Sequence, residues 1–393
     1  MGNRQTRSGR RLGVIVAALA ALSLIAFGAT LVKVNWLGNT SPGHVAELSS
    51  PGTTPSDQSP TAATGRHVHR PEGPRARNQR PRIKPTSGSA PTETPPTPAS
   101  SGAHSGLCAP TPHACGYPDS TNTGVPPGVG LRRVPGQITS GPGWRWNPGG
   151  WIDASKAGAV ISDISVDGAI SVNAPNVTIK DSYINCTGSC SFNIVVRDTS
   201  TGAEANANNT VVEDSTIIDT SDTSAAGIEA EDVQNTQVLR DNISGEGVGV
   251  LFAGGGGLIE DTYIHDLAVC CGYHNEDFQS TADGNVVLDH NTLFNRAEQT
   301  ADIRIGQDFG PQANVTVENN LLAGGGWTVY GGDTGNEESG PATNIKIINN
   351  RLSTLYYPKC GFYGWLIDFN TPPGAGNLVS GDYWDGTGKS TGN

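Results

Sequence analysis

A short pattern recurs between residues 176 and 352 and constrains the fold more than any other feature of the chain. Its copies begin at residues 176, 209, 235, 256, 285, 314 and 344, which are 33, 26, 21, 29, 29 and 30 residues apart. Each copy alternates apolar and polar residues, changes phase at a polar pair, and resumes with an apolar residue. Two short strands that meet at a tight bend give this pattern, because Asn and Asp tolerate the left-handed backbone conformation that a bend needs. Asn291, Asn320 and Asn350 occupy equivalent positions, which predicts a ladder of stacked amides.

A second set of short apolar strands lies between these copies. Its members are centred on residues 171, 195, 229, 249, 278, 303, 329 and 366. Three short strands in each coil of about 25–30 residues, without helices, are typical of a parallel solenoid. A β-propeller is the alternative, but each of its blades needs about 40 residues and four strands. The sequence therefore predicts an all-β parallel β-helix of about 7–8 coils within residues 106–393.

The repeats resemble the right-handed parallel β-helix of the pectin-lyase-like superfamily over about residues 150–370. The segment HNEDFQ at residues 274–279 is also similar to the H-N-D-G-I-Q segment of secreted β-helix-repeat proteins. This likeness continues through the DFGP segment at 308–311 and the AGGGW segment at 323–327. The chain departs from it at Glu276, where Asp is usual, and at Asp277, where Gly is usual.

The charge differs sharply between the two ends of the chain. Residues 1–105 hold 12 basic and 4 acidic side chains, a net charge of +8, and residues 106–393 hold 13 basic and 33 acidic, a net of −20. Affinity for nucleic acid comes mainly from Lys and Arg that neutralise phosphates. We therefore expect no nucleic-acid partner for the acidic region.

The N-terminal region predicts export of the remainder of the chain. Residues 12–32 carry no charge and follow a flank that contains four arginines. This length favours a membrane anchor within residues 1–37, with the basic flank in the cytoplasm and the C-terminal domain outside. A cleaved signal peptide, which would release a secreted protein, is the alternative. Residues 38–105 hold 12 of the 26 prolines and many Ser and Thr, as in a disordered linker.

The seven cysteines indicate disulfides in an exported protein. Cys108 with Cys115, and Cys186 with Cys190, are spaced to close small loops. Among Cys270, Cys271 and Cys360 one thiol is left unpaired, and the sequence does not identify which one. The oligomeric state also stays open.

Candidate site residues lie on the strands that contain residues 274–330. If Ile228, Val250, Phe278, Ile303 and Val329 point inward, their neighbours point outward and stack about 4.8 Å apart from coil to coil. The predicted catalytic residues are Asp277, Asp302, Arg304 and His274. The predicted substrate-binding residues are Glu276, Gln279, Trp327, Tyr330, Glu229 and Glu231.

Two close carboxylates form an acid–base pair, because their repulsion raises one pKa. Glycoside hydrolysis uses such a pair, and polygalacturonases of the resembled superfamily hold carboxylates on this face. The superfamily's pectate lyases instead use calcium and a basic residue, which implies Arg304 or His274 as the base and Asp277 and Asp302 as Ca²⁺ ligands. Neither motif set is complete in this chain, so the resemblance implies the location of the site and not the reaction.

These features predict an extracellular enzyme that cleaves a polysaccharide, either by hydrolysis without a cofactor or by elimination with Ca²⁺. The net charge of −20 opposes direct binding of a polyanion, so elimination requires the metal. The alternative function is a non-catalytic surface module that binds glycans or acts as a spacer. Outside this face, His265 with Asp266 is expected to form a local turn or an ion pair, and His290 is expected to pack at a bend.

Overall fold

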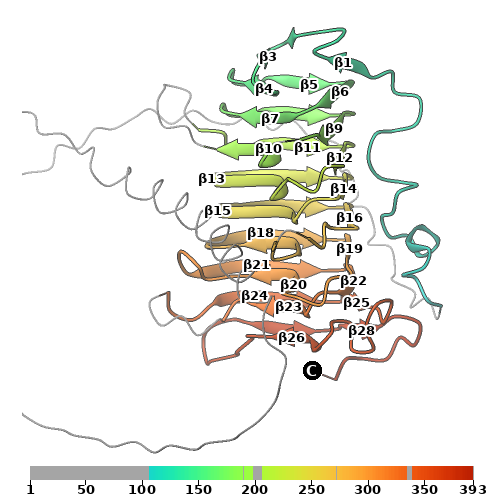
Figure 1. Cartoon of the computed structure of the whole chain (residues 1–393). Helices are drawn as coiled ribbons and strands as arrows, with labels where there is room; N and C mark the ends of the chain where they lie inside the picture. The colour runs from blue at the N-terminus through green and yellow to red at the C-terminus, as the bar shows by residue number, and fades with distance from the viewer. Residues whose placement is uncertain (1–105, 189, 198–205, 271, 334–338, 393) are drawn as a thin grey trace, which may run out of the picture. The chain divides into compact units, whose positions relative to one another are not determined.

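The computed structural model describes residues 106–188, 190–197, 206–270, 272–333 and 339–392, all of which belong to one compact unit. The predicted anchor and linker lie outside the described residues. No helix within the described part of the chain is long and apolar enough to cross a membrane. A 3-10 helix, η1 (Pro112–Cys115), precedes the first strand, and the other regular elements of this unit are strands stacked along one axis (Figure 1).

Parallel pairing joins equivalent strands of successive coils into a ten-stranded sheet, which we call the ten-strand sheet. Its strands, in order, are β1 (Arg132–Val134), β6 (Ile164–Asp167), β9 (Tyr183–Cys186), β12 (Thr216–Asp219), β14 (Asn242–Ser244), β16 (Tyr263–His265), β19 (Thr292–Asn295), β22 (Leu321–Gly324), β25 (Arg351–Leu352) and β28 (Tyr383–Trp384). Strands that are neighbours in this order belong to successive coils, so one coil of the chain separates them in sequence, as a solenoid requires.

The remaining parallel strands form two further stacks, which two long strands join into a single sheet. The first stack holds β4 (Trp151–Ala154), β7 (Ala169–Val172), β10 (Phe192–Arg197), the first halves of β13 (Ala226–Leu239) and β15 (Val248–Glu260), β17 (Glu276–Ser280), β20 (Ala301–Ile305), β23 (Trp327–Gly331) and β26 (Gly364–Ile367). The second stack holds β5 (Val160–Ser162), β8 (Thr178–Lys180), β11 (Val211–Glu213), the second halves of β13 and β15, β18 (Asp283–Asp289), β21 (Gln312–Glu318), β24 (Thr343–Ile348) and β27 (Leu378–Ser380). An all-β unit with long parallel sheets agrees with the predicted solenoid.

The polar pairs of the repeats form the bends, as predicted. The residue between the second stack and the ten-strand sheet has a positive φ in every coil. These residues are Asp163, Asp181, Asp214, Arg240, Asp261, His290, Asn319, Asn349 and Gly381. Asn and Asp are common in this left-handed conformation because their short polar side chains bond locally. The sequence pattern at the bends therefore has a direct conformational cause.

The predicted amide ladder is confirmed, and it lies inside the solenoid. Asn291 Nδ2 donates to Asn320 Oδ1 at 2.9 Å, and Asn320 Nδ2 donates to Asn350 Oδ1 at 3.0 Å. Asn350 Nδ2 continues the ladder to Asp382 Oδ1 at 2.9 Å. These side chains are fully or almost fully buried, so the ladder satisfies polar groups that water cannot reach.

Val, Ile and Leu side chains from all three stacks form one core along the axis. At its N-terminal end, β2 (Ser140–Gly141) and β3 (Trp144–Asn147) pair antiparallel and continue onto β4. Trp144 is buried there and Trp146 packs against the core, whereas Trp151 is 38% exposed. The antiparallel strands thus cover the terminal apolar layer, which a solenoid must shield from water.

Residues 106–131, which we call the strap, run along the outside of the ten-strand sheet from its last strands to its first (Figure 1). At one end Asp385 accepts hydrogen bonds from the backbone N–H groups of Cys108 and Ala109. Further along, the N–H of Gly124 donates to the carbonyl of Arg240 at 2.8 Å. Tyr117 packs with the outward side chains of β19 and β22. The strap therefore ties together coils that are far apart in the stack.

Disulfides join Cys108 to Cys115 and Cys186 to Cys190, as their spacing predicted. Cys270 is also disulfide-bonded, and Cys360 is the free cysteine of the described residues. Cys360 is fully buried, and its thiol donates to the carbonyl of Leu322. Disulfides of this kind persist in an oxidising environment.

Candidate functional site

One column of paired residues follows the outward face of the first stack, and we call it the outward column. Its members are Asp153, Ser171, Val195, Glu229, Leu251, Gln279, Arg304, Tyr330 and Ile367. The alternate residues Ile228, Val250, Phe278, Ile303 and Val329 are fully buried in the core, as expected. Gln279, Arg304 and Tyr330 are consecutive in the column and partly exposed. Three of the predicted site residues therefore lie side by side.

Arg304 is held in place by a bidentate ion pair. Its Nη1 and Nη2 atoms donate to the two carboxylate oxygens of Asp308 at 2.6 and 2.7 Å. Burial lowers the pKa of Arg304, but Asp308 and Glu276 outweigh that effect and raise it. Glu276 itself is fully buried, and burial raises its pKa well above the ordinary value. Glu276 therefore acts on Arg304 through its charge, and its side chain does not reach the surface where the sequence placed it.

Carboxylates that the sequence reading missed border the next member of the column. Burial raises the pKa of Tyr330, and the nearby charge of Asp368 raises it further. The N–H of Asp333 donates to the carbonyl of Asp368 at 2.8 Å, and Asn370 Nδ2 donates to Asp333 Oδ2 at 2.7 Å. Burial and the charge of Asp333 raise the pKa of Asp368. The signal in the sequence was the place of these acids, directly after the strands that carry Tyr330 and Ile367.

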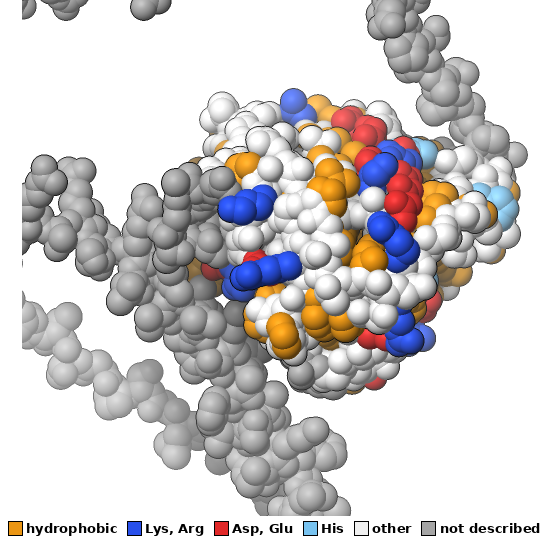
Figure 2. All heavy atoms as spheres, turned by 90° about the horizontal axis from the view of Figure 1, so that it is seen from above, with side chains coloured by type: hydrophobic (Ala, Val, Ile, Leu, Met, Phe, Trp, Pro, Cys, Tyr) orange, Lys and Arg blue, Asp and Glu red, His pale blue; other side chains and the backbone are white. Residues whose placement is uncertain are grey.

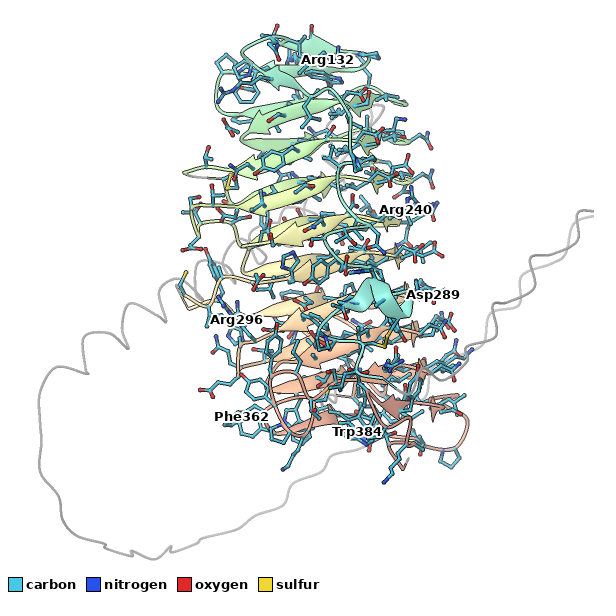
Figure 3. The ribbon with its side chains drawn as sticks, turned by 90° about the vertical axis from the view of Figure 1, so that its right-hand side faces the viewer. Arg132, Arg240, Asp289, Arg296, Phe362 and Trp384 are labelled. Carbon is cyan, nitrogen blue, oxygen red and sulfur yellow. A yellow bond between two sulfur atoms is a disulfide. The ribbon has the colours of Figure 1, made fainter. Side chains whose placement is uncertain are left out.

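Aromatic side chains form an exposed patch beside the column. The ring centroids of Trp327 and Tyr363 are 6.3 Å apart, and Phe362 packs edge-on against Tyr363 at 4.8 Å. Tyr363 is 56% exposed and Phe362 is 44% exposed. Phe362 and Arg296 lie on the side of the stack away from Arg240 and Asp289 (Figure 3). Flat rings that keep this much exposure offer a surface on which an apolar ligand face can stack.

The expectation that Asp277 and Asp302 face outward is wrong, because both side chains are fully buried. Gly227 and Gly249 occupy the equivalent position in the two preceding coils. A Cβ at Gly227 or Gly249 would meet the core side chain of Ile243 or Ile264. This position therefore lies at a corner that points toward the ten-strand sheet, and the strict alternation of a flat strand does not apply to it.

The two buried carboxyl groups interact with each other. Burial raises the pKa of Asp277 to about 7, and burial together with the charge of Asp277 raises the pKa of Asp302 well above its ordinary value. The backbone N–H of Ala323 lies close enough to Asp302 to favour its ionised form, but this effect is smaller than that of burial. A shared proton lets one carboxyl group donate to the other. Neither group reaches the surface, so the pair belongs to the interior of the solenoid and not to the outward column.

The same geometry does not fit the expected calcium site at Asp277 and Asp302. Ca²⁺ takes six to eight oxygen ligands, usually with water among them. These two side chains are enclosed beside the thiol of Cys360, which also adds to the raised pKa of Asp302. Within the part of the chain that the structure describes, no group of three or more His, Cys, Asp or Glu side chains is placed to hold a metal ion.

The remaining predicted residues lie at the edges of the outward column. His274 is exposed, and its Nδ1 atom is 3.1 Å from the hydroxyl of Thr300. Glu229 is a member of the column but only 6% exposed; burial and Glu231 raise its pKa to about 7, against the effect of Arg197. Glu231 is partly exposed and pairs in register with Arg197. In the outward column Leu251 and Gln279 separate Glu229 from Arg304.

His290 lies at its bend as expected, and His265 contacts Asp266, although burial lowers the pKa of its imidazole. The ring of His265 is 2.7 Å from Asp266, and His290 is 2.6 Å from Asp261 at its bend. Acidic and basic side chains gather along one side of the unit when it is seen from above (Figure 2).

No protein-family model matches the chain, and no curated protein matches its sequence.

Proposed function

We propose that this chain is an exported β-helix protein of the pectin-lyase-like type that binds a polysaccharide along the outward column. The observation that carries the proposal is the register of Gln279, Arg304 and Tyr330, with Trp327 and Tyr363 beside them. Amide, guanidinium and phenol groups bond to sugar hydroxyls, and aromatic rings stack on sugar faces. The anchor and the linker would present this face outside the cell.

The charge on this face favours a neutral polysaccharide. Asp308 occupies both terminal nitrogens of Arg304, and Asp333 and Asp368 add negative charge nearby. A uronate polymer at Arg304 and Tyr330 would meet these carboxylates, and the one guanidinium of the column is already paired with Asp308. The preferred ligand is therefore an uncharged chain whose hydroxyl groups can both donate and accept.

Replacing Trp327 by alanine should weaken binding about thirtyfold, because the loss of a stacked aromatic anchor costs about 2 kcal/mol. The measurement is retention of the full chain on a panel of insoluble polysaccharides, with affinities determined for those that retain it. Trp151→Ala is the matched control, because Trp151 is an exposed indole at the other end of the first stack. Retention by no polysaccharide, or equal losses in the two variants, would count against the proposal.

Cleavage is a second candidate, favoured by the neighbouring carboxylates Asp333 and Asp368. The raised pKa of Asp368 suits a general acid, and Asp333 would serve as the base that activates water. Arg304 and Tyr330 would position the sugar. The same panel, read by new reducing ends and by absorbance of unsaturated products, separates the possibilities: reducing ends without unsaturation support hydrolysis, and a retained but intact polysaccharide leaves binding as the function.

A further inference from the structure

One of the positive-φ bends between the second stack and the ten-strand sheet is occupied by a residue type that is rare in this conformation. Seven of the nine bend residues are Asp, Asn or Gly, and His290 is also of a type often found at positive φ. Arg240 has φ 57°, although a long side chain gains nothing from this conformation and is strained in it by about 1–2 kcal/mol. Strain of this kind persists where the side chain has a further role.

Arg240, Asp261 and His290 occupy three consecutive bends, and all three line one cavity. Its opposite wall is the strap, through Gly116, Pro118, Asn122 and Thr123, and its volume is about 210 Å³. A water molecule takes about 30 Å³ of liquid, so the cavity has room for about seven waters or for one sugar ring. Arg240 lies on the edge of the stack that faces the strap (Figure 3).

Both walls of the cavity are fixed in position. The disulfide between Cys108 and Cys115 closes the loop that leads into Gly116. The ring of Tyr117 stacks on His290 with centroids 5.3 Å apart. On the other side, Arg240 donates from Nε and Nη2 to Asp214 at 2.8 and 2.7 Å, and from Nη2 to Glu213 at 3.0 Å. A site that is built before a ligand arrives loses little entropy when it binds.

Within the described residues, three polar atoms of this wall make no hydrogen bond to protein: Nη1 of Arg240, Oδ2 of Asp261 and Nε2 of His290. They are a donor, an acceptor and a group that can do either. An anion would be repelled by Asp261 and by the neighbouring Glu213 and Asp214, and a cation by Arg240. A hydroxyl group, which both donates and accepts, matches all three atoms.

We propose that this cavity is a carbohydrate site, separate from the outward column, which takes a single neutral sugar residue between the strap and the three bends. It shares no residue with the outward column. The proposal for the cavity therefore does not depend on polysaccharide binding at the outward column. The sugar is either a free monosaccharide or the end of a longer glycan.

The experiment measures binding of the methyl glycosides of glucose, galactose, mannose and N-acetylglucosamine to the full chain by calorimetry. Arg240→Asn and His290→Asn restore the usual bend residue and should keep the fold, which a melting curve checks. We expect at least one glycoside to bind, and each variant to weaken it at least tenfold. Asn349→Asp, at an equivalent bend outside the cavity, should leave this affinity unchanged.

Absence of binding by all four glycosides overturns the proposal, as does equal affinity in wild type and in both cavity variants. A loss of affinity in Trp327→Ala but not in Arg240→Asn assigns the sugar to the outward column and also overturns it. Inorganic phosphate serves as the anion probe: binding of phosphate that depends on Arg240, in the absence of glycoside binding, contradicts the neutral ligand class.

Discussion

Replacing Arg351 by alanine should lower the free energy of unfolding by about 3–5 kcal/mol, because it leaves a buried carboxylate without its cation. Arg351 is 2% exposed and its Nε atom donates to Asp385 Oδ1 at 2.7 Å. A second guanidinium nitrogen, Nη2, donates to the carbonyl of Gly106 at 2.5 Å. Asp385 also holds the N–H groups of Cys108 and Ala109, so the same change loosens the start of the strap.

Chemical denaturation of Arg351→Ala and of the wild type measures this effect. The matched control is Arg133→Ala, which removes an exposed ion pair between Arg133 and Asp167 at 2.8 Å. Exposed pairs contribute about 0–1 kcal/mol, because water screens the charges. Losses of the same size in the two variants would show that the Arg351 pair does not anchor the strap. Protection of the strap amides against hydrogen exchange should fall in Arg351→Ala only.

The second large effect is a loss of stability as the pH rises, which originates in Asp277. The folded protein holds the proton of this group more tightly than the unfolded chain does, since burial raises the pKa from 3.8 to about 7. The stabilisation of the fold by this bound proton is fully present below the pKa that Asp277 has in the unfolded chain, near 4. It is lost as the pH rises through the pKa of the folded protein, about 7. Three pKa units correspond to about 4 kcal/mol.

Variants isolate this contribution from all other titrations in the chain. Asp277→Asn keeps the shape but does not titrate, so its stability relative to wild type should rise by about 4 kcal/mol between pH 4 and pH 8. The free energy of unfolding of the double variant Asp277→Asn/Asp302→Asn should depend on pH even less, because burial raises the pKa of Asp302 as well. Glu298→Gln, at an exposed carboxylate, is the control. A difference between Asp277→Asn and wild type that does not change with pH would contradict the buried pair.

Much of the fold could be predicted from the sequence, because the residue types within each repeat determine where the strands lie and where they bend. The polar pairs predicted the left-handed bends, and the equivalent positions of Asn291, Asn320 and Asn350 predicted their hydrogen bonds. The inward residues Phe278, Ile303 and Val329 follow from the period of two along a strand. Contacts made within a coil, or between one coil and the next, are local in a solenoid and are therefore readable from a repeat.

The site was predicted less well, because strict alternation fails where a strand turns a corner. It placed Asp277 and Asp302 outside, although Gly227 and Gly249 at the equivalent position show that little space is available there. Asp333 and Asp368 were missed because they follow their strands. The strap could not be placed, because its partners, such as Asp385, are hundreds of residues away in sequence.

Hydroxyl-radical footprinting tests the central claim most directly, because it reports the solvent access of individual aromatic side chains. The full chain is labelled with and without the polysaccharide that retains it. The account predicts that Trp327, Tyr330 and Tyr363 become protected, while Trp151 and the strap do not change. Protection elsewhere, with these three residues as reactive as in the free protein, would contradict a binding face on the outward column.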